Sequence, residues 1–165
     1  MKTLYINRHA KSNWNESGIS DYDRPLNTRG LLDATFMAKR FSEKSGGVDL
    51  ILSSPANRAL TTATFFAKEM GFATSKLKTE AGIYLASTQD LLKIVSQLDD
   101  AYQKVILFGH NPGFTYLAQY LTGEYVNMPT CAIVHVDFEV DSWKSIGADS
   151  GSLIALDYPK NHDIN

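Results

Sequence analysis

The sequence predicts an α/β fold, a single-domain three-layer sandwich in which a mostly parallel central sheet has helices on both faces and no lid subdomain. Short apolar segments alternate along the chain with longer segments whose apolar residues recur at helical spacing, as in βαβ units. The length of 165 residues is that of one domain, without a repeat, a low-complexity tract or a linker. Residues 1–165 are therefore expected to form one domain, with a frayed tail at 160–165.

Each element is supported by a local signal. The first strand is short and apolar, and the polar, Gly/Asn/Asp-rich stretch 10–27 that follows it predicts a long loop. Asn27 or Thr28 can cap the next helix through a side-chain oxygen, and Gly71 suits the end of a later helix. The expected elements, in chain order, are strand 3–6, a helix from 28 to the Gly46-Gly47 pair, strand 49–52, helix 56–70, strand 77–79, helix 88–98, strand 104–110, helix 112–121, and two or three strands within 131–158.

Composition and charge exclude several classes of protein. With 44% hydrophobic and 21% charged residues, the chain resembles an ordinary globular protein. Its net charge of -2 lacks the basic excess of a nucleic-acid or anionic-membrane binder. Cys131 is the single cysteine, so no intramolecular disulfide can form and a reducing compartment is favoured. No apolar run is long enough for a signal peptide or a membrane span, and we expect a cytoplasmic protein.

Basic and imidazole side chains follow three of the expected strands, at the end where each strand finishes. Arg8 and His9 follow the first strand, Arg58 follows the second, and His110 ends the segment "KVILFGH". Ligands of open parallel sheets bind beyond the carboxyl ends of the strands, so these four side chains are expected to converge. Guanidinium groups match phosphate oxygens, and the start of the helix after Pro112 adds free backbone N–H groups. The set predicts an anion site, and phosphate is the favoured anion.

An imidazole beside a bound phosphate can act as a nucleophile. A neutral ring nitrogen can accept a phosphoryl group near pH 7, which divides one difficult hydrolysis into two easier steps. Neighbouring cations disfavour protonation of the ring and stabilise the charge on the phosphoryl oxygens in the transition state. His135 and His162 lack metal-ligand spacing with another His or Cys, so no metal and no other cofactor is expected.

Three motifs taken together resemble the histidine phosphatase superfamily, the phosphoglycerate-mutase-like proteins. They are "RHAKS", "SSPxxRAxxTA" and "GHNPG". The additional stretches "DYDRPLNTRG" and "NMPTC", the short length and the lack of a lid insertion are similar to its small SixA-like phosphohistidine phosphatase branch, over residues 2–158. The resemblance implies that His9 is the phosphorylated nucleophile, that Arg8 and Arg58 hold the phosphoryl oxygens, and that His110 donates a hydrogen bond to them.

The same resemblance implies further phosphate contacts from the loop after the first strand. Arg24 matches a position that faces the phosphate in this branch, and Ser12 and Asn15 match neighbouring positions. An alternative for Arg24 is an ion pair with Asp21 or Asp23 on the loop. An alternative for Ser12 and Asn15 is that they only order the loop.

The sequence departs from the family pattern at the general acid. Many members carry a Glu or Asp for the leaving group after the third strand, but here the segment reads "TEAGIYLASTQD", with Leu85 after the tyrosine. Glu80 and Asp90 are the nearby acids, and neither has a convincing position. A leaving group that needs no such help, such as the imidazole of phosphohistidine, is compatible with this gap.

The absence of a lid segment bears on the substrate. An open cleft suits phosphate presented by a bulky partner, whereas small-molecule enzymes often enclose their substrates. We expect a metal-independent phosphatase that acts on phosphohistidine in a signalling protein, such as a phosphotransfer domain, through a covalent phosphohistidine intermediate. Two alternatives remain open, namely a phosphatase of small phosphoesters or phosphoanhydrides, and a phosphate-binding module without turnover.

Overall fold

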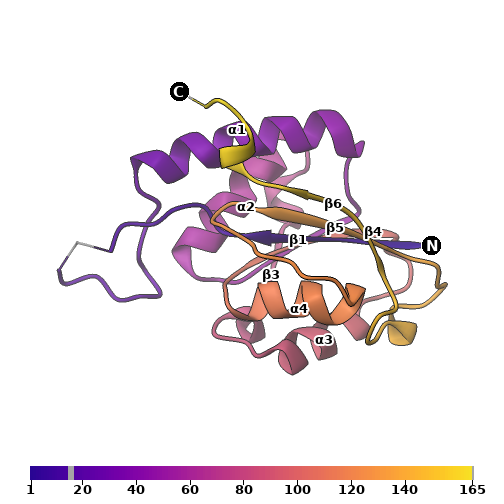
Figure 1. The fold of residues 1–165 in the computed structure, drawn as a ribbon. Coiled ribbons are helices and arrows are strands. Elements are labelled where there is room, and N and C mark those ends of the chain that lie inside the picture. The colour runs from indigo at the N-terminus through magenta and orange to yellow at the C-terminus, as the bar shows by residue number, and fades with distance from the viewer. Residues whose placement is uncertain (15–16, 165) are drawn as a thin grey trace.

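A central sheet of six strands organises the computed structural model, which describes residues 1–14 and 17–164 (Figure 1). The order of the strands across the sheet is β3-β2-β4-β1-β5-β6. The strands are β1 (Lys2–Arg8), β2 (Leu50–Ser53), β3 (Lys78–Thr79), β4 (Lys104–Gly109), β5 (Ile133–Phe138) and β6 (Ser152–Asp157). The helices are α1 (Thr28–Ser45), α2 (Asn57–Glu69), α3 (Thr88–Ser96) and α4 (Gly113–Thr122).

The strand directions bring the predicted functional segments to one edge of the sheet. Strands β1, β2, β3 and β4 are parallel, β5 is antiparallel to β1, and β6 is antiparallel to β5, so the predicted mostly parallel sheet is confirmed. Arg8 at the end of β1 pairs with Gly109 at the end of β4, and Ser53 at the end of β2 pairs with Phe108. The residues that follow β1, β2 and β4 therefore leave the sheet side by side.

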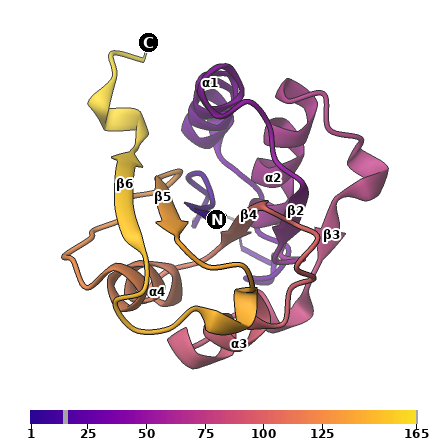
Figure 2. The ribbon, with the colours of Figure 1, turned by 90° about the vertical axis from the view of Figure 1, so that its right-hand side faces the viewer.

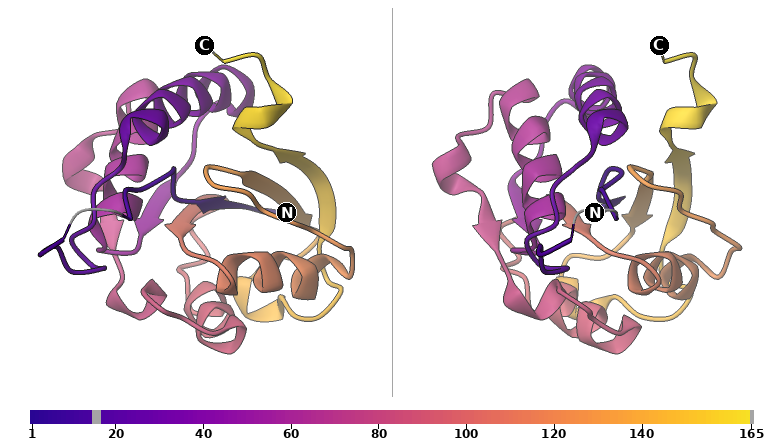
Figure 3. Two further views of the ribbon diagram at one scale, coloured as in Figure 1. Left: turned by 60° about the vertical axis from the view of Figure 1, so that its left-hand side comes forward. Right: turned by 90° about the vertical axis from the view of Figure 1, so that its left-hand side faces the viewer.

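Helices cover the sheet on both faces, as the alternation of elements predicted (Figure 2 and Figure 3). Strand β4 shows why its sequence is apolar throughout. Val105 and Leu107 pack into the cluster that contains residues of α3 and α4, whereas Ile106 and Phe108 pack into the cluster that contains residues of α1 and α2. A strand buried on both faces needs apolar side chains in both directions, and this produces a continuous run rather than an alternating one.

The start of α1 is tied to the segment that follows His9. The Asn27 side chain accepts a hydrogen bond from Gly30 N at 2.8 Å, which makes Asn27 the N-cap. The backbone N–H of Asn27 also donates to Lys11 O at 3.0 Å. A Cβ at Gly30 would overlap that same carbonyl oxygen, so only glycine allows this close approach. The helix thereby fixes the chain immediately after the first strand.

Two strands, β5 and β6, lie within the range in which two or three were expected. Between them the segment around Trp143 forms a 3-10 turn (Trp143–Ser145), because Ser142 caps it and the indole N–H donates to Tyr102 O. Farther along the chain, His162 Nε2 lies 2.7 Å from Asp157 Oδ1. No helix in the described part of the chain has the length and apolarity needed to cross a membrane.

Candidate active site

His9 is held between the ends of two strands. Its backbone N–H donates to Gly109 O at 3.0 Å, and its carbonyl accepts from Cys131 N at 2.9 Å. Nδ1 lies 2.6 Å from Ala10 O, and since a carbonyl can only accept, we assign the ring proton to Nδ1. Nε2 therefore carries the lone pair, and it accepts from Arg58 Nε at 3.4 Å. The ring is orientated with its nucleophilic nitrogen toward a cation.

Burial and neighbouring charges keep the His9 ring neutral. The residue is only 7% exposed. The pKa of His9 is lowered to about 3, chiefly by burial and also by His110, Arg58 and Arg8, against the opposing effect of the hydrogen bond to Ala10 O. At pH 7 the Nε2 lone pair is therefore free of a proton, as a nucleophile requires.

Arg58 and Arg24 meet at one carboxylate. Arg58 donates through its two terminal nitrogens to Asp21 O at 2.6 Å and to Asp21 Oδ2 at 3.1 Å. Arg24 donates to Asp21 Oδ1 at 2.8 Å and to Ser12 Oγ, and its guanidinium lies 3.6 Å from the centre of the Trp14 ring. Arg24 thus lies in the same cleft as Arg58 and forms the ion pair with Asp21 that was one of its two expected roles.

Arg8 approaches from the other side of the cleft. It donates to Met128 O at 3.0 Å, while its buried Nε has no hydrogen-bond partner among the described residues. Burial lowers the pKa of the Arg8 guanidinium. Asn111 Nδ2 donates to the same Met128 oxygen at 2.9 Å, so the segment around residues 127–131 supports one wall of the cleft.

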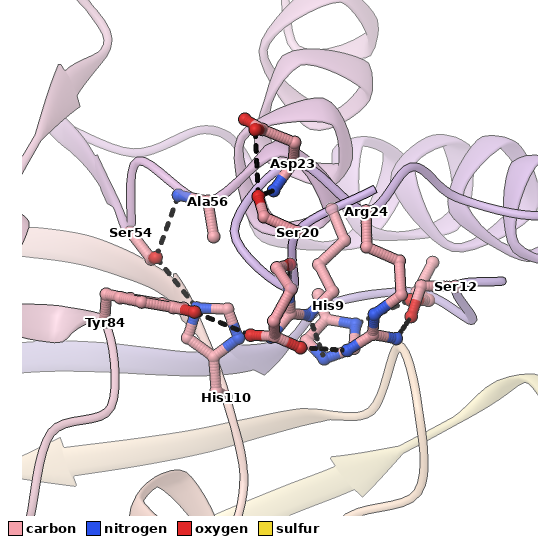
Figure 4. Close-up of polar contacts among 12 residues, drawn as sticks. His9, Ser12, Ser20, Asp23, Arg24, Ser54, Ala56, Tyr84 and His110 are labelled. Atoms are coloured by element: carbon pink, nitrogen blue, oxygen red, sulfur yellow. Dashed lines mark hydrogen bonds and ion pairs between the residues drawn. The ribbon is translucent and has the colours of Figure 1, made fainter. Parts of the chain in front are cut away.

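His110 faces His9 across the cleft, with ring centroids 5.3 Å apart (Figure 4). Its Nε2 lies 2.8 Å from Ser54 Oγ, which also accepts from Ala56 N, and we assign the hydroxyl proton of Ser54 to the contact with the ring. This leaves the proton of the neutral ring on Nδ1, which is buried without a partner in the described part of the chain. Burial lowers the pKa of His110 to about 4, and Arg58 is the next cause. The ring offers an unused N–H donor.

Asp21, which the sequence suggested only as an ion-pair partner of Arg24, is itself a residue of the cleft. Its carboxylate accepts from Arg24 and Arg58, and also from Tyr84 Oη at 2.6 Å. The hydrogen bond from Tyr84 and the two arginines hold the pKa of Asp21 well below its usual range. Asn57 donates to Asp23 O at 3.0 Å and holds this loop against the start of α2. The available signal was the stretch "DYDRPL", which places an acid three residues before the predicted phosphate ligand.

The two acids considered from sequence lie elsewhere. Glu80 accepts from Gly82 N at 3.0 Å, and Asp90 accepts from Ser87 N at 3.1 Å, so both carboxylates cap short turns or helices. Neither lines the cleft, which corrects their candidacy as general acid. Leu85 does line the cleft, and it is 76% exposed with a φ of 57°.

The remaining groups expected to bind phosphate are Ser12, Asn15 and the backbone N–H groups at the start of α4. Ser12 is buried and accepts from Arg24, whereas Asn15 lies outside the described residues. The expectation of free N–H groups after Pro112 is wrong for Phe114 and Thr115, which donate to His110 O and to Asn111 Oδ1. Across the described ranges, no group of three His, Cys, Asp or Glu side chains is arranged to hold a metal ion.

A cleft of about 620 Å³ is lined by the functional side chains described above, namely Arg8, His9, Ser12, Asp21, Arg24, Arg58 and His110. Its walls come from the loop after β1, from residues 85–87 and from the turn into α4. Three guanidinium groups, one neutral imidazole whose Nε2 carries no proton and one imidazole with a free N–H therefore face a single space. This arrangement can bind a tetrahedral oxyanion and present a nucleophile to it.

Comparison with known proteins relates the chain to phosphatases. Residues 4–83 match the model of the histidine phosphatase superfamily, branch 1. An uncharacterized chloroplastic protein of Arabidopsis thaliana is 28% identical over 158 residues, which cover 91% of this chain and 72% of that protein. A protein of Hydrogenobacter thermophilus assigned as phosphoserine phosphatase 2 is 41% identical over 73 residues, which cover 43% of this chain and 35% of that protein.

Two solved structures share the fold over nearly the whole chain. A protein of Agrobacterium tumefaciens assigned as the phosphohistidine phosphatase SixA is 27% identical, with a TM-score of 0.81 over 96% of this chain and 98% of that one. The protein histidine phosphatase SixA complexed with tungstate is 23% identical, with a TM-score of 0.82 and the same coverage of 96% and 98%. The second likeness concerns the fold alone.

Proposed function

The chain belongs to the histidine phosphatase superfamily, and from this premise we propose that it is a metal-independent phosphatase that removes phosphate from phosphohistidine on a signalling protein. One observation carries the proposal. His9 Nε2 carries no proton at pH 7, the ring is fixed through Nδ1 by Ala10 O, and Arg58 Nε donates to Nε2 at 3.4 Å. A neutral, orientated imidazole beside cations is suited to receive a phosphoryl group.

In the proposed reaction, the His9 Nε2 lone pair attacks phosphorus and the bond to the leaving group breaks. Arg8, Arg24 and Arg58 bind the phosphoryl oxygens, and the free Nδ1–H of His110 donates to one of them. These groups stabilise the charge that spreads over the oxygens in the transition state. Water then attacks phosphorus in phospho-His9, which releases inorganic phosphate and returns the electron pair to Nε2.

A protein substrate is favoured by the surroundings of the cleft. The chain between β2 and β4 contributes α2, β3 and α3 to the sheet and its covering layers, and the described part of this segment contains no additional subdomain. Trp14 is 77% exposed and Leu85 is 76% exposed, so apolar side chains border the opening. An apolar rim around an open phosphate site suits contact with a second protein.

A small phosphoester is the second candidate substrate. The match to the Hydrogenobacter thermophilus protein assigned as phosphoserine phosphatase 2 favours it, since the 73 residues compared are 41% identical. Release of phosphate from a histidine-phosphorylated phosphotransfer domain and from phosphoserine, measured side by side, separates the two candidates. A higher kcat/KM for the phosphorylated domain supports the leading proposal, and a higher value for phosphoserine replaces it with the second.

Substitution of the nucleophile tests either form of the proposal. We expect His9→Ala to abolish turnover of both substrates with little change in Tm, because the residue follows the end of β1 and its backbone hydrogen bonds remain. His135→Ala is the matched control, since His135 lies on β5 and does not line the cleft. Undiminished activity of His9→Ala would rule out the proposed mechanism.

A further inference from the structure

A carboxylic acid lies inside a cleft that is otherwise suited to an anion. Among the described residues that line the cleft, Asp21 is the one acid. Oδ1 accepts from Arg24 at 2.8 Å, and Oδ2 accepts from Arg58 at 3.1 Å and from Tyr84 Oη at 2.6 Å. The guanidinium groups that are proposed to hold phosphate therefore also hold this carboxylate, and substrate must share them with Asp21.

The position of Asp21 relative to the nucleophile is defined by one guanidinium. Arg58 donates through Nε to His9 Nε2 at 3.4 Å and through a terminal nitrogen to Asp21 Oδ2 at 3.1 Å. The nucleophilic nitrogen of His9 and the carboxylate of Asp21 thus contact neighbouring nitrogens of the same Arg58 guanidinium. Arg58 thus connects the nitrogen proposed to attack phosphorus with the one carboxylate among the described residues that line the cleft.

We propose that Asp21 is the proton donor for the leaving group when the phosphoryl group passes to His9, and the base that activates water in the second step. This rests on the phosphatase function proposed above. In the first step the His9 Nε2 lone pair forms the bond to phosphorus, the bond from phosphorus to the leaving atom breaks, and that atom keeps the electron pair and takes the Asp21 proton. In the second step water forms the new bond to phosphorus, its proton passes to the Asp21 carboxylate, and the electron pair returns to Nε2.

The charges around Asp21 explain how it acquires its proton. In the free protein the hydrogen bond from Tyr84, with Arg24 and Arg58, keeps the pKa of Asp21 low, so the group is a carboxylate. A phosphoryl dianion between the same arginines competes for them and adds a negative charge nearby. Both effects raise the pKa of Asp21. Substrate binding therefore favours protonation of Asp21, which in the proposed reaction then donates this proton to the leaving group.

Other polar groups near Asp21 are less suited to this role. Tyr84 already donates its proton to Asp21, and that hydrogen bond raises the pKa of the phenol. The neutral His110 ring has one proton, on Nδ1, and in the proposed reaction this proton forms a hydrogen bond with a phosphoryl oxygen. The low pKa of His110 disfavours a second proton on the ring. Arg24 and Arg58 stay charged as ligands of the oxyanion.

The test compares two substrates that differ in their need for a proton. Phenyl phosphate releases a basic phenolate, whereas 4-nitrophenyl phosphate releases a stable nitrophenolate. We expect Asp21→Asn to lower kcat/KM for phenyl phosphate by about 10²-fold or more, with a much smaller loss for 4-nitrophenyl phosphate. Asp23→Asn is the matched control, since Asp23 lies on the same loop outside the cleft and bonds to Ser20.

Each outcome decides a different point. An equal loss of kcat/KM for both substrates in Asp21→Asn, or no loss for either, overturns the role of Asp21 and leaves the phosphatase intact. No turnover and no phospho-His9 in the unsubstituted protein defeats the proposed function, and the role of Asp21 with it.

A second variant covers the case in which Asp21→Asn fails to fold. Tyr84→Phe keeps the charges of Arg24 and Arg58 but removes the hydrogen bond from Tyr84 that lowers the pKa of Asp21. Because the donor is active when protonated, we expect kcat/KM for phenyl phosphate to persist to higher pH in this variant. An unchanged pH profile contradicts the proposal.

Discussion

At the scale of single residues, Asp21 contacts the two arginines that we propose to bind phosphate, so the two anions are expected to compete. Asp21→Asn removes one negative charge from the cleft, and we expect orthophosphate to bind about fivefold more tightly to this variant. Titration calorimetry in buffers of different ionisation enthalpy measures the affinity together with proton uptake. The unsubstituted protein is expected to take up a proton on binding, and the variant is not. Weaker binding by the variant would show that Asp21 helps to bind the anion.

The buried histidines predict how stability depends on pH. The pKa values of His9, about 3, and His110, about 4, lie below the ordinary value of 6.5. Between pH 6.5 and about 4 the unfolded chain binds protons at both rings that the folded state excludes. Stability is therefore retained above pH 6.5 and falls as the pH drops through this window, by about 1.4 kcal/mol per histidine per pH unit.

Urea unfolding at pH 7 and pH 5 measures this effect. We expect the double variant His9→Gln, His110→Gln to lose most of the difference between the two pH values, and His135→Gln, remote from the cleft, to keep it. An unaltered pH dependence in the double variant would mean that other groups control acid unfolding.

At the scale of elements, the close contact between α1 and the segment after His9 positions the cleft. We expect Gly30→Ala to destabilise the protein by about 1–3 kcal/mol, because the added methyl group overlaps Lys11 O and forces the two backbones apart. The displaced segment carries Ser12, so kcat/KM should also fall. Leu31→Ala, at an exposed position in the same turn, serves as the control in urea unfolding and activity measurements. Equal stability of the two variants would refute the close contact.

The elements also explain how much could be predicted from the sequence. Parallel strands end at one edge of their sheet, so the convergence of His9, Arg58 and His110 follows from the strand pattern alone. The capping role of Asp90 at the start of α3 could also be predicted, since Ser87 precedes it by three residues as in a capping box. The position of Asp21 could not be predicted, because a loop takes its conformation from partners distant in sequence, here Asn57 and Tyr84.

At the scale of the whole molecule, a chain of net charge -2 gathers three arginines around one cleft. Charge stabilisation in the proposed mechanism comes from these guanidinium groups. We therefore expect phosphatase activity to be unchanged after dialysis against a chelator and to fall steeply in Arg58→Lys, which loses the planar donor group. Activity that disappears with the chelator and returns with a divalent cation would contradict metal independence.

The central claim is that phosphate passes through a covalent bond to His9 Nε2. The most direct measurement is brief exposure to a labelled phosphodonor, a denaturing quench, and mapping of the labelled residue. We predict acid-labile, alkali-stable phosphate on His9 in the unsubstituted protein and none in His9→Ala. Turnover of the donor without any label on His9, or label on a different residue, would contradict the account.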